Sequence, residues 1–145
     1  MDLHSALKRH FGFDRFRPGQ LEACTAALAD RDVLVVMPTG SGKSLCYQLP
    51  ALMRDDLTVV VSPLVALMQD QVDALRARGL GDSVGLVNAQ QDAAANTAVV
   101  DRAVAGDLRL LYVAPERFSS PGFVAGMEKA RVGLFVVDEA HCVSQ

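Results

Sequence analysis

The stretch "VLVVMPTGSGKS" carries residue types that suit chemistry on phosphates. Gly40 and Gly42 follow an apolar run, and Lys43 and Ser44 stand directly behind them. Because glycine has no Cβ, successive backbone N–H groups from about Thr39 to Ser44 can turn toward one anion. Lys43 would add a flexible positive charge at the phosphates, and the Ser44 hydroxyl is placed to ligate Mg²⁺.

The stretch departs from the strict G-x-x-x-x-G-K-[ST] pattern, because Met37 stands where the first glycine belongs. An ordinary turn with a surface lysine is the alternative. We favour a phosphate loop because a strand, a turn and a helix are expected in the order that the motif demands. The loop comprises Thr39, Gly40, Ser41, Gly42, Lys43 and Ser44.

A second stretch, "LFVVDEAH", ends an apolar run with two acids. Asp138 would hold Mg²⁺ directly or through water, and Glu139 would take a proton from an attacking water or orient it. A solvated acidic turn after a core strand is the alternative. An upstream phosphate loop favours the catalytic interpretation.

The third stretch, "FGFDRFRPGQ", precedes the first strand. We expect Pro18 in the first turn of a helix, with Gln20 in that same turn. A glutamine amide can make two hydrogen bonds to the edge of adenine, and an aromatic ring and a guanidinium can sandwich the base. Phe13, Arg17 and Gln20 therefore form a candidate adenine reader. Alternatively, Phe13 and Phe16 are core residues.

These stretches must be positioned by alternating strands and helices. Continuously apolar runs predict strands at 32–37, 57–62, 83–88, 108–114 and 132–138. Helical spacing covers 18–30, 42–56, 63–79 and 92–107, with Pro50 expected to kink or shorten the second helix and Gly79 expected to cap the third. This alternation predicts an α/β fold with a mainly parallel sheet and helices on both faces. Ligands of such sheets bind at the carboxyl ends of the strands.

Composition sets broader limits. A chain of 145 residues fits one domain, and half of its residues are apolar. The formal charge of −3 argues against a broadly basic nucleic-acid binder. Its three cysteines form no metal-binding pattern, and no apolar run is long enough to span a bilayer. We therefore expect a cytoplasmic protein with no membrane partner.

Together these stretches resemble the first half of a superfamily 2 helicase, specifically the RecQ family of ATP-dependent DNA helicases. "FGFDRFRPGQ" is similar to that family's motif 0, "MPTGSGKS" to motif I and "SPLVALMQDQV" to motif Ia. "YVAPERF" resembles motif Ib, and "VVDEAHCVSQ" resembles motif II. RNA helicases of the DEAD-box class instead carry P-T-x-x-Q before the loop and DEAD in motif II.

The resemblance implies a RecA-like P-loop domain over residues 1–145, with N-terminal helices over 1–31. It implies that ATP and Mg²⁺ are bound, with Lys43 and Glu139 catalytic, Ser44 and Asp138 on the metal, and His141 coupling nucleotide state to DNA. The segments implied to face single-stranded DNA contain Ser62, Pro63, Leu64, Pro115, Glu116 and Arg117.

The resemblance also implies that such helicases continue past motif II into a second RecA-like domain. We expect this chain to be an incomplete motor that binds Mg-ATP but does not unwind DNA by itself, whereas the intact protein would unwind DNA 3'-to-5' in repair or recombination. Two alternatives remain open: a stand-alone nucleotide-binding or regulatory module, and a P-loop kinase or transferase.

Overall fold

The computed structural model of the chain describes residues 2–29, 33–37, 44–63, 65–88 and 91–138, of which 33–37 and 138 are described by their backbone alone. Its α-helices are α1 (Leu3–Phe11), α2 (Gln20–Ala29), α3 (Leu45–Met53), α4 (Val65–Ala77), α5 (Ala93–Val104) and α6 (Pro121–Met127). Its strands are β1 (Val33–Met37), β2 (Leu57–Val61), β3 (Val84–Val87), β4 (Leu110–Val113) and β5 (Val132–Asp138). Short 3₁₀ helices lie at η1 (Gly81–Ser83) and η2 (Pro115–Ser119).

The strands form one parallel sheet in the order β1-β5-β2-β4-β3. Each of the five apolar runs of the sequence contains one of these strands, so the predicted parallel α/β fold is confirmed. Parallel strands need helical crossovers, which explains why helices separate them in the chain. The carboxyl ends of all five strands therefore lie along one edge of the sheet.

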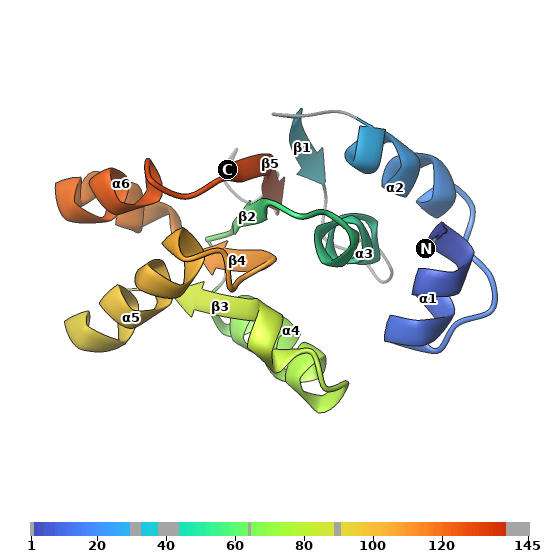
Figure 1. The fold of residues 1–145 in the computed structure, drawn as a ribbon, viewed down its shortest axis with the longest axis horizontal. Helices are drawn as coiled ribbons and strands as arrows, with labels where there is room; N and C mark the ends of the chain where they lie inside the picture. The colour runs from blue at the N-terminus through green and yellow to red at the C-terminus, as the bar shows by residue number, and fades with distance from the viewer. Residues whose placement is uncertain (1, 30–32, 38–43, 64, 89–90, 139–145) are drawn as a thin grey trace.

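Both faces of the sheet are covered. One set of alternating strand residues, including Val60, Tyr112 and Leu134, packs with the buried side chains of α1, α2, α3 and α4. The other set, including Val59 and Leu111, packs with α5 and α6. In Figure 1, α5 and α6 lie together, away from α1, α2 and α3. Burial on both faces explains why the strands are continuously apolar instead of alternating.

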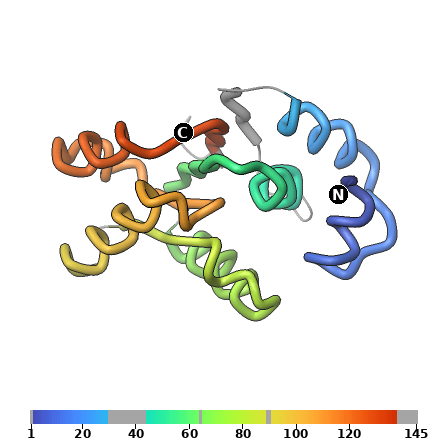
Figure 2. The backbone as a smooth tube through the Cα atoms, in the orientation of Figure 1, coloured from blue at the N-terminus to red at the C-terminus, as the bar shows by residue number. Residues whose placement is uncertain are grey.

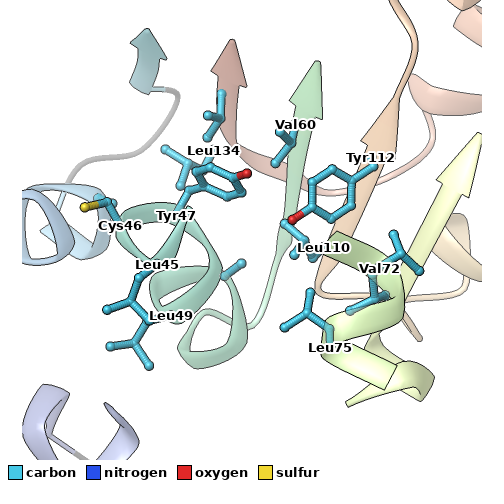
Figure 3. Close-up of a cluster of buried hydrophobic side chains, with 14 of the residues drawn as sticks. Leu45, Cys46, Tyr47, Leu49, Val60, Val72, Leu75, Leu110, Tyr112 and Leu134 are labelled. Carbon is cyan, nitrogen blue, oxygen red and sulfur yellow. The ribbon is translucent and has the colours of Figure 1, made fainter. Parts of the chain in front are cut away.

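The larger core lies between the sheet, α3 and α4 (Figure 3). The rings of Tyr47 and Tyr112 meet edge to face there, with centroids 6.4 Å apart and planes inclined by 71°. Both rings are fully buried, and both hydroxyls have partners: Tyr47 donates to Gln71 Oε1 at 2.7 Å, and Tyr112 accepts from Gln48 Nε2 at 2.8 Å. These hydrogen bonds fix α3 against α4 and β4.

The helices agree with the sequence-based expectation in one detail and differ in another. Helix α3 ends at Met53, shortly after Pro50, and is shorter than the span 42–56, in line with the expected effect of Pro50. Helix α6 was not predicted; Phe123 holds it in place by packing edge to face on Phe118, with ring centroids 5.4 Å apart. Within the described part of the chain, no helix is long and apolar enough to cross a membrane.

Candidate functional site

The strand that precedes the predicted phosphate loop lies beside the strand that leads into the predicted acid pair. In the parallel pair β1–β5, Met37 is in register with Asp138. Met37 and Asp138 therefore end neighbouring strands at the same edge of the sheet. The residues from Thr39 to Lys43, together with Glu139 and His141, lie outside the described residues.

A cavity of about 350 Å³ lies between the N-terminal segment, the start of α3 and the second half of α4. The segment between α1 and α2 contributes Phe13 and Arg17 to its wall, and α2 contributes its first residue, Gln20. Ser44, the last residue of the predicted phosphate loop, lines the same cavity at the start of α3. The tube of Figure 2 shows the N-terminal segment passing beside α3, which explains how these distant parts of the sequence meet. The three predicted adenine-reading residues thus share one cavity with an end of the phosphate loop.

The turn from Arg17 to Gln20 fixes the glutamine side chain. The Gln20 N–H donates to the Arg17 carbonyl at 3.0 Å, and Gly19 adopts a φ of 87°. Proline followed by a glycine of positive φ is the pattern of a type II turn. Helix α2 therefore begins at Gln20, and the expectation that Pro18 lies in its first turn is wrong. The Pro-Gly dipeptide was the signal for this turn.

Within this turn, the Arg17 N–H donates back to Gln20 Oε1 at 2.7 Å. Gln20 is only 7% exposed, so its amide is held in one orientation. A carbonyl oxygen has two lone pairs, and Oε1 can accept a second hydrogen bond from a ligand such as the N6 amino group of adenine. The turn thereby presents a fixed hydrogen-bonding edge to the cavity.

The aromatic part of the site is Phe13, whose side chain is half exposed at 49%. The guanidinium carbon of Arg78 lies 5.8 Å from the centre of this ring and 5.4 Å from the centre of the Phe11 ring. Arg78 follows α4, and the sequence analysis did not include it in the site. In the sequence, a basic residue near the end of a helix gives no sign of anything but exposure to solvent. Only the tertiary structure shows that Arg78 contacts the two phenyl rings.

The cavity suits an anionic ligand with a flat apolar part. Arg15, Arg17 and Arg78 line it, and no carboxylate occurs among its described lining residues. Phe13 supplies an aromatic face, and Gln20 supplies an amide edge. Planar guanidinium groups pair with phosphates and stack on rings, which a lysine does less well.

Three comparisons with known proteins relate this geometry to a family. The DEAD/DEAH box helicase family matches residues 17–145. The chain belongs to this helicase family. It is 47% identical to the ATP-dependent DNA helicase RecQ of Haemophilus influenzae over 97% of its own length, and 41% identical to RecQ of Bacillus subtilis, also over 97%. The resemblance to RecQ helicases that the motifs indicated is thereby confirmed.

The chain spans about a quarter of each of these relatives, 22% of the first and 24% of the second. Among solved structures, the DUF1998 helicase MrfA bound to DNA matches 94% of this helicase domain with a TM-score of 0.67 and 17% identity, and the chain spans 26% of it. At that identity the match supports the fold alone, and it agrees with the RecA-like architecture expected from the motifs.

The two segments expected to face DNA also lie at the carboxyl edge of the sheet. The Ser62 N–H donates to the Val113 carbonyl at 3.3 Å, which joins the end of β2 to the end of β4. Ser62 is buried at 2% exposure and offers little surface to a ligand, whereas Pro63 and Glu116 are exposed. Arg117 lies against the Phe123 ring, 5.9 Å from its centre. Leu64 lies outside the described residues.

Cys24 and Cys46 are buried and are not among the residues that line the cavity. A hydrogen bond to Cys46, followed by burial, raises the pKa of Cys24 far above its usual range, so this thiol stays protonated at neutral pH. Both cysteines are free within the described chain, and Cys142 lies outside it. Among the described residues, no group of three His, Cys, Asp or Glu could hold a metal ion.

Proposed function

We propose that this domain binds Mg-ATP and serves as the ATP-binding motor domain of a RecQ-like DNA helicase. The observation that carries the proposal is the shared cavity: the adenine-reading residues Phe13, Arg17 and Gln20 line it together with Ser44 of the phosphate loop. A nucleotide whose base is held by the adenine-reading residues would direct its phosphates toward Ser44. The similarity to relatives named ATP-dependent DNA helicases supports this assignment.

The donor types fit Mg²⁺, which prefers hydroxyl, carboxylate and phosphate oxygens. Asp138 ends the strand adjacent to β1, and Ser44 begins the helix after the loop. Bound Mg²⁺ would neutralise charge on the phosphates. Lys43 would hold the β- and γ-phosphates, and Glu139 would accept the proton of the attacking water. We propose that His141 couples nucleotide state to DNA.

DNA is the proposed partner. Pro63 and the start of η2 at Pro115 lie at neighbouring strand ends. We propose that backbone N–H groups of the residues after each proline meet the phosphates of a single strand there. The net charge of −3 predicts that such contacts are local and few. In an intact helicase of this type, we propose that ATP hydrolysis drives 3'-to-5' unwinding.

Calorimetry with Mg-ATP tests the nucleotide site. The wild-type chain should bind, and Lys43→Ala should weaken binding by about tenfold or more, because it removes a charged hydrogen bond to the phosphates. Lys129→Ala is the matched control, since Lys129 is exposed after α6. Equal binding by wild type and Lys43→Ala, or no binding by either, would contradict the assignment.

We also propose that these 145 residues alone bind ATP but turn it over near background. An arginine finger contributes about 10³–10⁵ in rate to related reactions, and the resemblance places it in a second domain. The assay is DNA-stimulated phosphate release, compared with that of a longer chain carrying a second RecA-like domain. Robust turnover by the 145 residues, abolished by Glu139→Gln, would refute this part of the proposal.

A further inference from the structure

We propose that Arg78 is a positioning residue of the base site, which holds Phe13 in place as the stacking surface for adenine. This inference rests on the proposed nucleotide site and adds to it a residue from α4. None of the predicted nucleotide contacts involves this helix. Although Arg78 lines the cavity, its guanidinium is engaged by the Phe11 carbonyl and the two phenyl rings, so we expect it to act through Phe13 and not by pairing with the phosphates.

The contacts of Arg78 join the end of α4 to the adenine-reading segment. Its Nη1 donates to the Phe11 carbonyl at 2.8 Å, across 67 positions of sequence. Its guanidinium lies within cation–π range of both the Phe11 and the Phe13 rings. Phe11 is buried at 6% exposure and anchors this arrangement, while Phe13 keeps half of its surface open. Arg78 therefore restrains an aromatic ring that the core does not hold.

The backbone of Arg78 is itself fixed. The Leu80 N–H donates to the Leu75 carbonyl and the Gly79 N–H donates to the Arg76 carbonyl, both at 3.0 Å. Gly79 has a φ of 82°, and this pair of hydrogen bonds defines a Schellman motif. Leu75 is buried, so the end of α4 is anchored to the core. The guanidinium is thus projected from a rigid helix end onto the Phe13 ring.

A half-exposed ring that must stack on a ligand loses rotamer freedom when it binds. Restraining the ring beforehand reduces that loss and raises affinity for the base. The predicted phosphate loop follows β1, whereas the contacts of Arg78 described above are made to Phe11 and Phe13. The inference therefore separates base binding from phosphate binding, and the two can be measured independently.

The experiment measures binding of Mg-ADP and of Mg-tripolyphosphate by calorimetry to the wild-type chain and four variants, one of which is the Lys43→Ala variant described above. Arg78→Ala should weaken Mg-ADP binding by about two- to twelve-fold, the equivalent of the roughly 0.5–1.5 kcal/mol that immobilising one side chain costs. Its affinity for tripolyphosphate should stay within twofold of wild type. Arg78→Lys should fall between wild type and Arg78→Ala, because it keeps the charge but not the planar group.

Arg76→Ala is the matched control. Arg76 lies two residues earlier, is exposed, and pairs at 3.6 Å with Asp73, away from the cavity. It should bind both ligands as wild type does. Unchanged Mg-ADP affinity in Arg78→Ala would overturn the inference, and so would equal weakening of both ligands, which indicates general damage to the fold. If wild type binds neither ligand, the inference and the proposed function both fail; if Lys43→Ala alone weakens binding, only the inference fails.

Discussion

Removing Arg54 should destabilise the domain more than removing an exposed charged residue, because the Arg54 guanidinium is buried and hydrogen-bonded through all three of its nitrogens. Its Nε and Nη2 donate to the two carboxylate oxygens of Asp56 at 2.8 and 3.0 Å. Its Nη1 donates to the Ala27 carbonyl at 2.6 Å, and Nη2 also donates to the Gly133 carbonyl at 3.1 Å. Arg54 thereby links α2, the end of α3 and the start of β5.

The magnitude follows from burial. The Arg54 and Asp56 side chains are 7% and 12% exposed. Arg54→Ala leaves a buried carboxylate and two carbonyls without their donor, and breaking such a pair costs about 3–5 kcal/mol. The free energy of unfolding of a domain of this size is about 5–15 kcal/mol, so the substitution removes a large share of its stability.

Equilibrium urea unfolding followed by circular dichroism measures this effect. The double variant Arg54→Met/Asp56→Leu should be less destabilised than Arg54→Ala, because it removes the buried charge together with its partner. Arg76→Ala breaks an exposed pair and should cost about 0–1 kcal/mol. A loss for Arg54→Ala no larger than that for Arg76→Ala would refute the reasoning.

Three further predictions concern the same fold. Gly133→Ala should destabilise by about 1–3 kcal/mol in urea unfolding, because its Cβ would overlap the Asp56 carboxylate, whereas Gly122→Ala on α6 meets no atom and should not destabilise. Burial, and then the charge of Arg9, lower the pKa of His10 in the folded protein. The unfolded chain therefore binds a proton at His10 at higher pH than the folded chain does, and the free energy of unfolding should fall as the pH drops through about 6.5. His10→Gln should flatten this fall when melting is measured as a function of pH. Cys24 should resist iodoacetamide at pH 8 until the chain is unfolded, and rapid labelling of the native protein would contradict its burial.

The strands were predictable from the sequence because burial on both faces requires continuous apolar runs, and each such run forms a strand. That Met37 and Asp138 lie at the same edge of the sheet was also predictable, because ligands of parallel sheets bind at the carboxyl ends of the strands. Helix α6 was not, since it has seven residues and two glycines. Its stability comes from tertiary packing, because Phe123 joins the core cluster that contains residues of β2, β4 and α5, and such packing carries no local signal.

The site proposed to bind the base was also predictable only in part. Phe13, Arg17 and Gln20 were found because their side chains suit adenine, and the structure brings them to one cavity. Arg78 was missed because nothing in its local sequence indicates that it reaches the Phe11 carbonyl. The turn at Pro18 and Gly19 was misjudged because proline is common both in first helical turns and in type II turns. The positive φ of Gly19 decides between them.

Competition between ADP and GDP for the cavity tests the central claim most directly. Gln20 is held so that Oε1 can accept from the N6 amino group of adenine, whereas guanine presents an oxygen acceptor at that position. The wild-type chain should therefore prefer Mg-ADP to Mg-GDP by about 5- to 150-fold, the equivalent of about 1–3 kcal/mol for a mismatched hydrogen bond. Gln20→Ala should lose most of this preference. Equal affinity of the wild-type chain for ADP and GDP would contradict the account.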